Sequence, residues 1–323
     1  MRINETASNQ ELIFEKYANE RWLQYIKEEP CDETKRRIKE LLEIFAENPL
    51  APGREVEYPD DTTPENLRRS DISIAESRKM VMYKPKYKDV DCDKVVLYVH
   101  GGGFVRGNEK WCRACGIHLA NLLKLPTYCC TYRYAPEHKY PCGLDDVEKA
   151  WNYLVEELNI SPEKIILVGE SAGGNFAMAL IVRLIAKAKE LPGQMLMISP
   201  CIDMKFRGLS YNVNTAIDPE FKGINPKKMF EVYAEPLQLE LPEVSPIYGE
   251  LEKFPKTMFY ADDCEIFVSD SLQAAQRMAD AGIPVCCYIS HNLLHASVLE
   301  MPEMPESQRF FEEAKKFCGL NKL

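Results

Sequence analysis

Gly-Glu-Ser-Ala-Gly at residues 169–173 follows the apolar run 165–168 and leads into a helical stretch, 175–180. A strand, a G-x-S-x-G turn and a helix in this order indicate a nucleophile elbow, in which the glycines leave room for a sharp bend that presents the serine at the edge of a sheet. Amides just past the serine can face a developing negative charge. This context favours Ser171 as a nucleophile; a serine in an ordinary strand-to-helix loop is the alternative.

A glycine-rich loop follows an earlier apolar run. His-Gly-Gly-Gly-Phe at residues 100–104 comes directly after the run 95–99. Three glycines let the backbone turn with its amides exposed, as in the oxyanion loop of lipases and esterases. We expect the amides of Gly102, Gly103 and Ala172 to stabilise a tetrahedral oxyanion. A phosphate loop is the alternative, but neither G-x-x-x-x-G-K-[ST] nor G-x-G-x-x-G follows.

Strand and helix patterns alternate from about residue 95 onward. This alternation predicts an α/β fold whose mostly parallel central sheet is flanked by helices on both faces. The expected strands are 95–100, 127–132, 165–169, 194–199, 257–261 and 285–290, with an earlier pair between 72 and 83. The expected helices are 111–123, 143–158, 174–188, 270–281 and 306–318. The apolar runs suit strands that are buried on both sides.

Two regions interrupt the alternation. Residues 9–47 are charged with a helical period, and residues 205–245 are irregular, rich in aromatic residues and proline, with a further helix expected near 226–234. A long insertion in a compact fold is often a lid over a site, and a surface excursion is the alternative. We therefore divide the chain into an N-terminal helical cap segment (1–50), a first part of the core (51–204), a cap insertion (205–245) and a second part of the core (246–323).

The composition is that of a globular protein and excludes several kinds of partner. The 323 residues carry a net charge of −10, whereas binding to a nucleic-acid backbone or an anionic membrane needs a basic face. The start of the chain shows no apolar segment typical of a signal peptide. The most apolar helix candidate, 176–186, is too short to span a bilayer and contains Arg183. We expect a cytoplasmic protein with no nucleic-acid or membrane partner.

Twelve cysteines are many for this length. Without a secretion signal, we expect reduced thiols. Cys112 and Cys115 form a C-x-x-C motif that is typical of thioredoxin-like redox sites, and His118 raises a metal-binding alternative. No second C-x-x-C pair completes a zinc site, and the motif opens a predicted helix. We therefore interpret both thiols as structural and expect neither a metal nor an organic cofactor.

Three motifs together resemble a known family. The segments 100–104, 132–138 (Tyr-Arg-Tyr-Ala-Pro-Glu-His) and 169–175 are similar, in order and spacing, to those of the hormone-sensitive-lipase-like (bacterial family IV) esterases. The resemblance covers about residues 70–318. It implies an α/β-hydrolase fold with a helical cap, an acyl-enzyme mechanism without a cofactor, and a triad in the order serine, acid, histidine. By analogy with similar esterases, a homodimer is expected.

The resemblance also implies which residues complete the triad. His295 follows the last predicted strand and fits the base position, whereas the local alternative, His291, lies very close to the strand end. Similar esterases usually read D-x-L-x-D at the acid position, and the matching segment here begins at Glu265. Glutamate can orient an imidazole as aspartate does. Asp263 and Asp262 are the alternative acids.

These observations predict a serine carboxylesterase that hydrolyses short-chain acyl esters, from acetyl to butyryl, such as O-acetylated sugars or other small-molecule esters. Bulky side chains in both cap segments favour a short acyl pocket. The alternative is a non-catalytic small-molecule-binding protein on the same fold, because fold alone does not determine function. The presence of both Ser171 and His295 favours the enzyme.

Overall fold

A computed structural model describes most of the chain beyond residue 62. The described residues are 2–3, 63–75, 78–86, 93–105, 107, 109–218, 220–221, 232–302 and 304–320. Apart from residues 2–3, the expected cap segment 1–50 lies outside the described residues. So do residues 226–231 of the helix expected near 226–234.

A nine-stranded sheet forms the centre of the described chain. In spatial order its strands are β1 (Arg2–Ile3), β9 (Val285–Ser290), β8 (Thr257–Asp262), β7 (Gln194–Ile198), β6 (Ile165–Glu170), β4 (Val95–Val99), β5 (Thr127–Cys130), β3 (Arg78–Pro85) and β2 (Leu67–Ala75). Strands β4 to β9 pair in parallel, whereas β1, β2 and β3 run antiparallel to their neighbours. The expected mostly parallel sheet is confirmed. The short edge strand β1 was not expected from the sequence.

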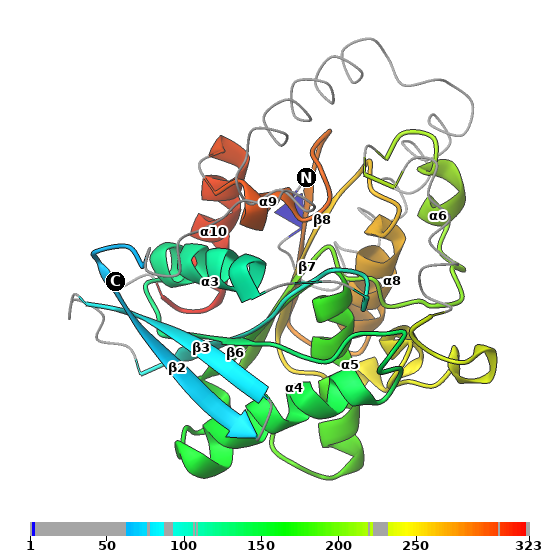
Figure 1. Ribbon diagram of the computed structural model, residues 1–323. Coiled ribbons are helices and arrows are strands. Elements are labelled where there is room, and N and C mark those ends of the chain that lie inside the picture. Colours follow the sequence, from blue (N-terminus) through cyan, green and yellow to red (C-terminus); the bar gives the residue numbers. More distant parts are fainter. Residues whose placement is uncertain are drawn as a thin grey trace.

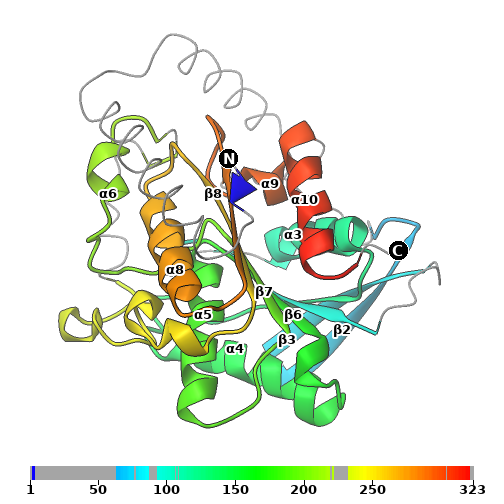
Figure 2. The ribbon, with the colours of Figure 1, turned by 180° about the vertical axis from the view of Figure 1, so that it is seen from behind.

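Helices cover both faces of this sheet (Figures 1 and 2). On one face lie α3 (Glu109–Leu123), α9 (Ser297–Glu300) and α10 (Pro305–Phe317), and on the other lie α4 (Cys142–Asn152), α5 (Ala172–Ala186) and α8 (Val268–Asp280). Side chains of β4 alternate between the two cores: Val96 and Tyr98 pack on the α3 side, Leu97 and Val99 on the α5 side. Burial on both faces explains why the central strands are continuous apolar runs.

The remaining elements are short. A π-helical turn, η1 (Tyr153–Glu157), continues α4, so the helix expected at 143–158 is present as two joined pieces. The insertion 205–245 contains α6 (Ser210–Val213) and η3 (Pro236–Gln238). A further 3-10 turn, η4 (Pro246–Tyr248), follows directly after the insertion. Two further 3-10 turns, η2 (Pro162–Lys164) and η5 (Leu251–Lys253), precede β6 and β8.

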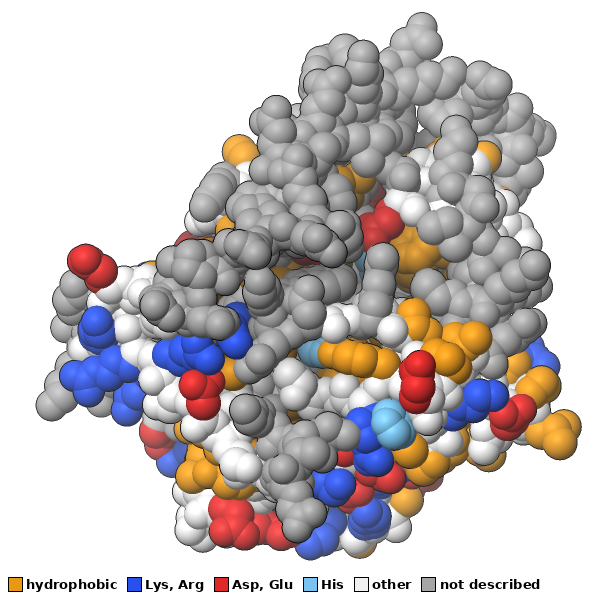
Figure 3. Space-filling model, in the orientation of Figure 1, with side chains coloured by type: hydrophobic (Ala, Val, Ile, Leu, Met, Phe, Trp, Pro, Cys, Tyr) orange, Lys and Arg blue, Asp and Glu red, His pale blue; other side chains and the backbone are white. Residues whose placement is uncertain are grey.

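The parallel strands bring six loops to one edge of the sheet. The loops after β4, β5, β6, β7, β8 and β9 all leave from carboxyl ends, which is where open α/β sheets bind ligands. No helix in the described part of the chain has both the length and the apolar character needed to cross a bilayer. On the face shown in Figure 3, basic and acidic side chains are interspersed across the lower part of the described surface.

Candidate active site

Ser171 occupies a strained turn between β6 and α5. Its φ of 52° and ψ of −122° are rare for a residue with a side chain. The Ser171 amide donates to the carbonyl oxygen of Ile198 at 2.9 Å, which ties the turn to β7. A Cβ on Gly173 would lie 2.1 Å from the carbonyl oxygen of Val99, so only glycine lets α5 begin this close to β4. The expected elbow is therefore present.

The glycine loop lies against this serine. A Cβ on Gly101 would lie 3.0 Å from the Cβ of Ser171. The hydroxyl of Tyr132 lies 2.8 Å from the carbonyl oxygen of His100 and 2.9 Å from that of Gly101, and its proton is shared between them. The Tyr132 and His100 rings also stack, with centroids 4.3 Å apart. Tyr132 thus fixes the loop whose amides were expected to bind an oxyanion.

The three expected oxyanion-hole residues lie on adjacent loops. Gly102 and Gly103 follow β4, and Ala172 follows β6. These two strands are neighbours, and Val99 at the end of β4 pairs with Gly169 near the end of β6. Ala172 is the first residue of α5, so its amide has no acceptor within the helix. Gly102, with a φ of 111°, adopts a backbone conformation that favours glycine. The structure thus brings these residues to neighbouring strand ends.

His295 contacts the acid expected from the sequence. Its Nδ1 lies 2.5 Å from Oε2 of Glu265, and both side chains are buried. Within the described residues, the other ring nitrogen, Nε2, has no hydrogen-bond partner. The amide of the next residue, Ala296, donates to Oγ of Ser199, and Ser199 follows Ile198, whose carbonyl oxygen accepts from the Ser171 amide. The loop that carries His295 is therefore tied to the strand end that also holds the Ser171 turn.

Burial and hydrogen bonds act in opposite directions on the pKa of Glu265, and burial has the larger effect. Burial raises the pKa of Glu265, whereas the amide of Asp262 and the hydroxyl of Ser199 donate hydrogen bonds that oppose this rise. The Ser199 oxygen in turn accepts from the amide of Ala296 at 3.1 Å. A single buried serine thus contacts both the acid and the loop that carries His295.

The alternative acids use their carboxylates elsewhere. Asp262 accepts a hydrogen bond from the Ser290 hydroxyl at 2.6 Å, and Asp263 lies 2.8 Å from Nδ1 of His291. His291 was the alternative base, so the second histidine pairs with the second acid. Two histidines and three acids were considered for the triad, and the structure pairs His295 with Glu265, as the resemblance implied.

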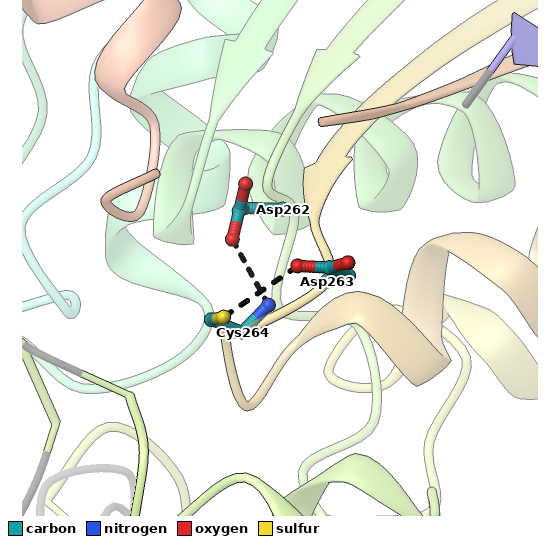
Figure 4. A group of neighbouring side chains, drawn as sticks. All are labelled: Asp262, Asp263 and Cys264. Carbon is teal, nitrogen blue, oxygen red and sulfur yellow. Dashed lines mark hydrogen bonds between the residues drawn. The ribbon is translucent and has the colours of Figure 1, made fainter. Parts of the chain in front are cut away.

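The loop after β8 also contains a group of side chains that could ligate a metal ion, namely Asp262, Asp263 and Cys264 (Figure 4). Their ligating atoms lie within 4.8 Å of one another. The Cys264 amide, however, donates to Asp262 at 2.9 Å, and the Cys264 thiol donates to Asp263 at 3.5 Å. Together with Ser290 and His291, these donors engage the carboxylates in holding two loops together.

Aromatic side chains surround the pair. The rings of Phe221 and Phe267 lie 5.3 and 5.2 Å from the imidazole of His295. Tyr233, from the insertion, stacks on Phe104 of the glycine loop at 4.0 Å. The insertion therefore contributes side chains next to both the histidine and the oxyanion loop.

The C-x-x-C motif lies inside the core. Cys112 and Cys115 on α3 are both buried, and burial raises the pKa of the Cys115 thiol well above its ordinary value. His118, on the same helix, contacts the carbonyl oxygen of Leu299 through Nδ1 at 3.0 Å. Buried neutral thiols are poor nucleophiles and poor ligands, so the motif packs α3 against the sheet.

Sequence reasoning did not identify Tyr132 and Ser199 as parts of the site. Tyr132 opens the motif 132–138, and both residues lie at the carboxyl end of a strand that neighbours β4 or β6, so these were the available signals. Their residue types alone carried no sign of a role, because buried serines and tyrosines that bind backbone groups are common.

The sequence matches known proteins over most of the described chain. Residues 96–299 match the profile of a family described as alpha/beta hydrolase fold. An acetyl-hydrolase of Streptomyces hygroscopicus is 26% identical, over 69% of this chain and 75% of that protein. An esterase of Acinetobacter venetianus is 28% identical, over 59% of this chain; the match spans 63% of that esterase, less than two thirds of its length.

Two solved structures have the same fold. An esterase from the bacterial hormone-sensitive lipase family matches with a TM-score of 0.74 and 23% identity, over 90% of this chain and 98% of that chain. An esterase whose crystals were soaked with p-nitrophenyl butyrate matches with a TM-score of 0.75 and 23% identity, over 87% of this chain and 97% of that chain. At this identity the likeness establishes the fold.

Proposed function

Because this chain belongs to the α/β-hydrolase fold family, we propose that it is a serine carboxylesterase with Ser171 as nucleophile, His295 as base and Glu265 as acid. The resemblance to hormone-sensitive-lipase-like esterases is confirmed by the family match and by the likeness to an esterase of that family. The observation that carries the proposal is the 2.5 Å contact between His295 and Glu265, on a loop that is hydrogen-bonded to the end of β7 to which the Ser171 amide also donates.

The geometry supports a two-step acyl transfer. In the first step, Nε2 of His295 accepts the Ser171 proton while Oγ attacks the ester carbonyl carbon, and the amides of the glycine loop and Ala172 stabilise the oxyanion. Glu265 holds the Nδ1–H and stabilises the imidazolium. The alcohol then leaves with the proton of His295. In the second step, a water activated by His295 releases the carboxylic acid and restores Ser171.

We propose acetyl to butyryl esters as substrates, including O-acetylated sugars and other small esters. Phe221 next to His295, and Tyr233 stacked on Phe104, support a short acyl site. The first relative's name, acetyl-hydrolase, supports the same substrate class. The buried Nε2 of His295, without a partner among described residues, favours catalysis over the non-catalytic binding alternative. The homodimer, the cytoplasmic location and the division into cap and core stay predictions.

A chain-length series of nitrophenyl esters, kept below their micelle concentrations, tests both parts of this proposal. A longer chain gains about 0.8 kcal/mol per buried CH₂ only where room exists, and beyond that it meets the cost of overpacking. We expect kcat/KM to be highest from acetyl to butyryl and to fall steeply by octanoyl. A higher kcat/KM for decanoate than for acetate would rule out the short site, and no hydrolysis of any ester would rule out the esterase.

A further inference from the structure

Asn214, in the cap insertion, holds the loop that carries the acid. It is fully buried and follows α6. Its Nδ2 group donates to the backbone carbonyl oxygens of Asp263 at 2.9 Å and of Glu265 at 2.8 Å. One side-chain amide thus binds the loop by hydrogen bonds on both sides of Cys264. Buried carbonyl groups need such donors, so Asn214 fixes the backbone at the point where it presents Glu265.

The next residue of the loop, Ile266, is held by the same insertion at both of its backbone polar groups. The Ser210 hydroxyl donates to the carbonyl oxygen of Ile266 at 2.5 Å, and Oδ2 of Asp218 accepts from the Ile266 amide at 2.8 Å. The other carboxylate oxygen of Asp218 accepts from the amides of Glu220 and Phe221 at 2.9 and 3.0 Å. Asp218 therefore links the acid loop to the backbone of Phe221.

Phe221 completes the connection, because its ring lies edge-on to the imidazole of His295, with centroids 5.3 Å apart and planes at 87°. Edge-to-face contacts of this kind restrict the orientation of both rings. A single short segment therefore contacts the backbone that carries the acid and the ring of the histidine. A lid that opens to admit substrate would have to break these buried hydrogen bonds.

We propose that residues 210–218, together with Phe221, are a fixed scaffold for the Glu265–His295 pair, and that Asn214, Ser210 and Asp218 are positioning residues. This inference rests on the proposed function, since it assigns the scaffold to the pair that activates Ser171. It also separates the described start of the insertion from any part of the cap that moves over the substrate.

The test compares Asn214→Ala and Ser210→Ala with two matched controls. Asn175 is equally buried and also donates through Nδ2 to two carbonyl oxygens, those of Cys201 and Val244, at 2.9 Å each. Ser245, like Ser210, bridges a carbonyl oxygen and an amide, here of Leu239 and Met204. Asn175→Ala and Ser245→Ala thus remove the same hydrogen bonds without touching the acid loop.

Two measurements report the pair itself. The acid limb of the kcat/KM profile reports the ionisation of the essential acid–base pair in the free enzyme. The proton on the short Nδ1–Oε2 bond should give a far-downfield NMR resonance, which does not depend on turnover. We expect Asn214→Ala and Ser210→Ala to lower kcat about tenfold with little change in KM and to weaken or shift this resonance. Both variants should also move the acid limb to lower pH by at least about 0.5 unit, because a loosened carboxylate holds the proton of the pair less tightly.

The controls Asn175→Ala and Ser245→Ala should lose thermal stability, but the acid limb of kcat/KM and the resonance of the Nδ1–Oε2 proton should not change. An unchanged limb and resonance in Asn214→Ala and Ser210→Ala would overturn the scaffold, as would equal changes in the controls. If Asn214→Ala does not fold, Ser210→Ala decides. If the parent protein neither hydrolyses esters nor reacts with a fluorophosphonate, the proposed function fails, whereas the NMR comparison still decides whether the segment positions the pair.

Discussion

Glu265 reaches the imidazole of His295 with one methylene more than an aspartate would have, and its backbone lies two residues beyond Asp263. The sequence alone left three acids open, because all of them follow the same strand. Hydrogen bonds separate them: Asp263 pairs with His291, and Asp262 binds Ser290. The partner of each carboxylate depends on contacts between two loops, and no local pattern encodes such contacts.

This difference predicts the effect of two substitutions. Glu265→Gln should lower kcat more than about 100-fold, since a neutral amide favours the wrong histidine tautomer. Asp263→Asn should do much less, because its partner is the other histidine. Steady-state kinetics on nitrophenyl acetate measures both variants. The reverse ranking would assign the acid to Asp263, and near-parental rates in both would point to Asp262.

The buried thiols of α3 predict a neutral outcome. The double variant Cys112→Ser, Cys115→Ser should keep esterase activity within about threefold, since no step of the acyl transfer uses a thiolate. Activity per folded enzyme, with folding checked by circular dichroism, is the measurement. Loss of activity in a folded variant, or dependence of the parent's activity on a reductant, would contradict the packing role and revive the redox interpretation.

At the scale of elements, the sequence predicted the parts whose physics is local. The strands of the parallel sheet were visible because burial on both faces demands continuous apolar runs, and β9 has the bounds expected for it. The sequence did not reveal β1, whose two residues pair with Tyr288 and Cys287 at the far edge of the sheet. The role of α6 was equally hidden, because its hydrogen bonds reach a loop that is distant in sequence.

The close packing at the start of α5 predicts that Gly173→Ala, which adds one methyl group there, lowers both stability and activity strongly. In Gly173→Ala the new Cβ would meet backbone, the carbonyl oxygens of Val99 and His100 at 2.1 and 2.3 Å, and backbone cannot swing aside as a side chain does. We expect a marked loss of thermal stability and at least about a 100-fold loss of activity.

Gly282→Ala is the matched control for this variant. Its φ of 78° makes alanine strained there, but the added Cβ meets nothing within 4 Å. It should cost about 1–2 kcal/mol of stability and leave activity unchanged. Thermal unfolding and esterase rates are compared side by side. Similar melting temperatures for the two variants would show that the close approach at Gly173 is not essential.

At the scale of the whole molecule, the order and spacing of three motifs was enough to predict the α/β-hydrolase fold. Each motif lies at a strand end, so their order along the chain follows the order of the sheet connections. The contacts of the insertion 205–245 could not be predicted in the same way, because this segment carries no motif and its hydrogen bonds are made by scattered polar side chains such as Asn214 and Asp218.

Buried carboxyl groups predict how stability depends on pH. Burial raises the pKa of Asp270 from 3.8 to about 8 and that of Asp218 from 3.8 to about 6. The folded chain therefore keeps protons that the unfolded chain releases near pH 4. The stability that these groups contribute is complete at low pH and is lost as the pH rises through about 8.

Burial has the opposite consequence for His100. It lowers the pKa of that imidazole from 6.5 to about 4, so its effect on stability is confined to pH below 6.5. We therefore expect the melting temperature to fall between about pH 6.5 and about pH 9, and Asp270→Asn to flatten this slope. Calorimetry across this range is the measurement. A melting temperature that rises with pH there would contradict the assignment of buried, protonated carboxyls.

The central claim is that the strained turn after β6 presents an activated serine. Its most direct test is to treat the native protein with a fluorophosphonate, digest it and locate the adduct by mass spectrometry, with Ser171→Ala alongside. Because the adduct forms only on a serine activated by its neighbours, we expect one phosphonyl group per chain, on the peptide containing Ser171, and none on the variant. An adduct on another residue, or equal labelling of Ser171→Ala, would contradict the claim.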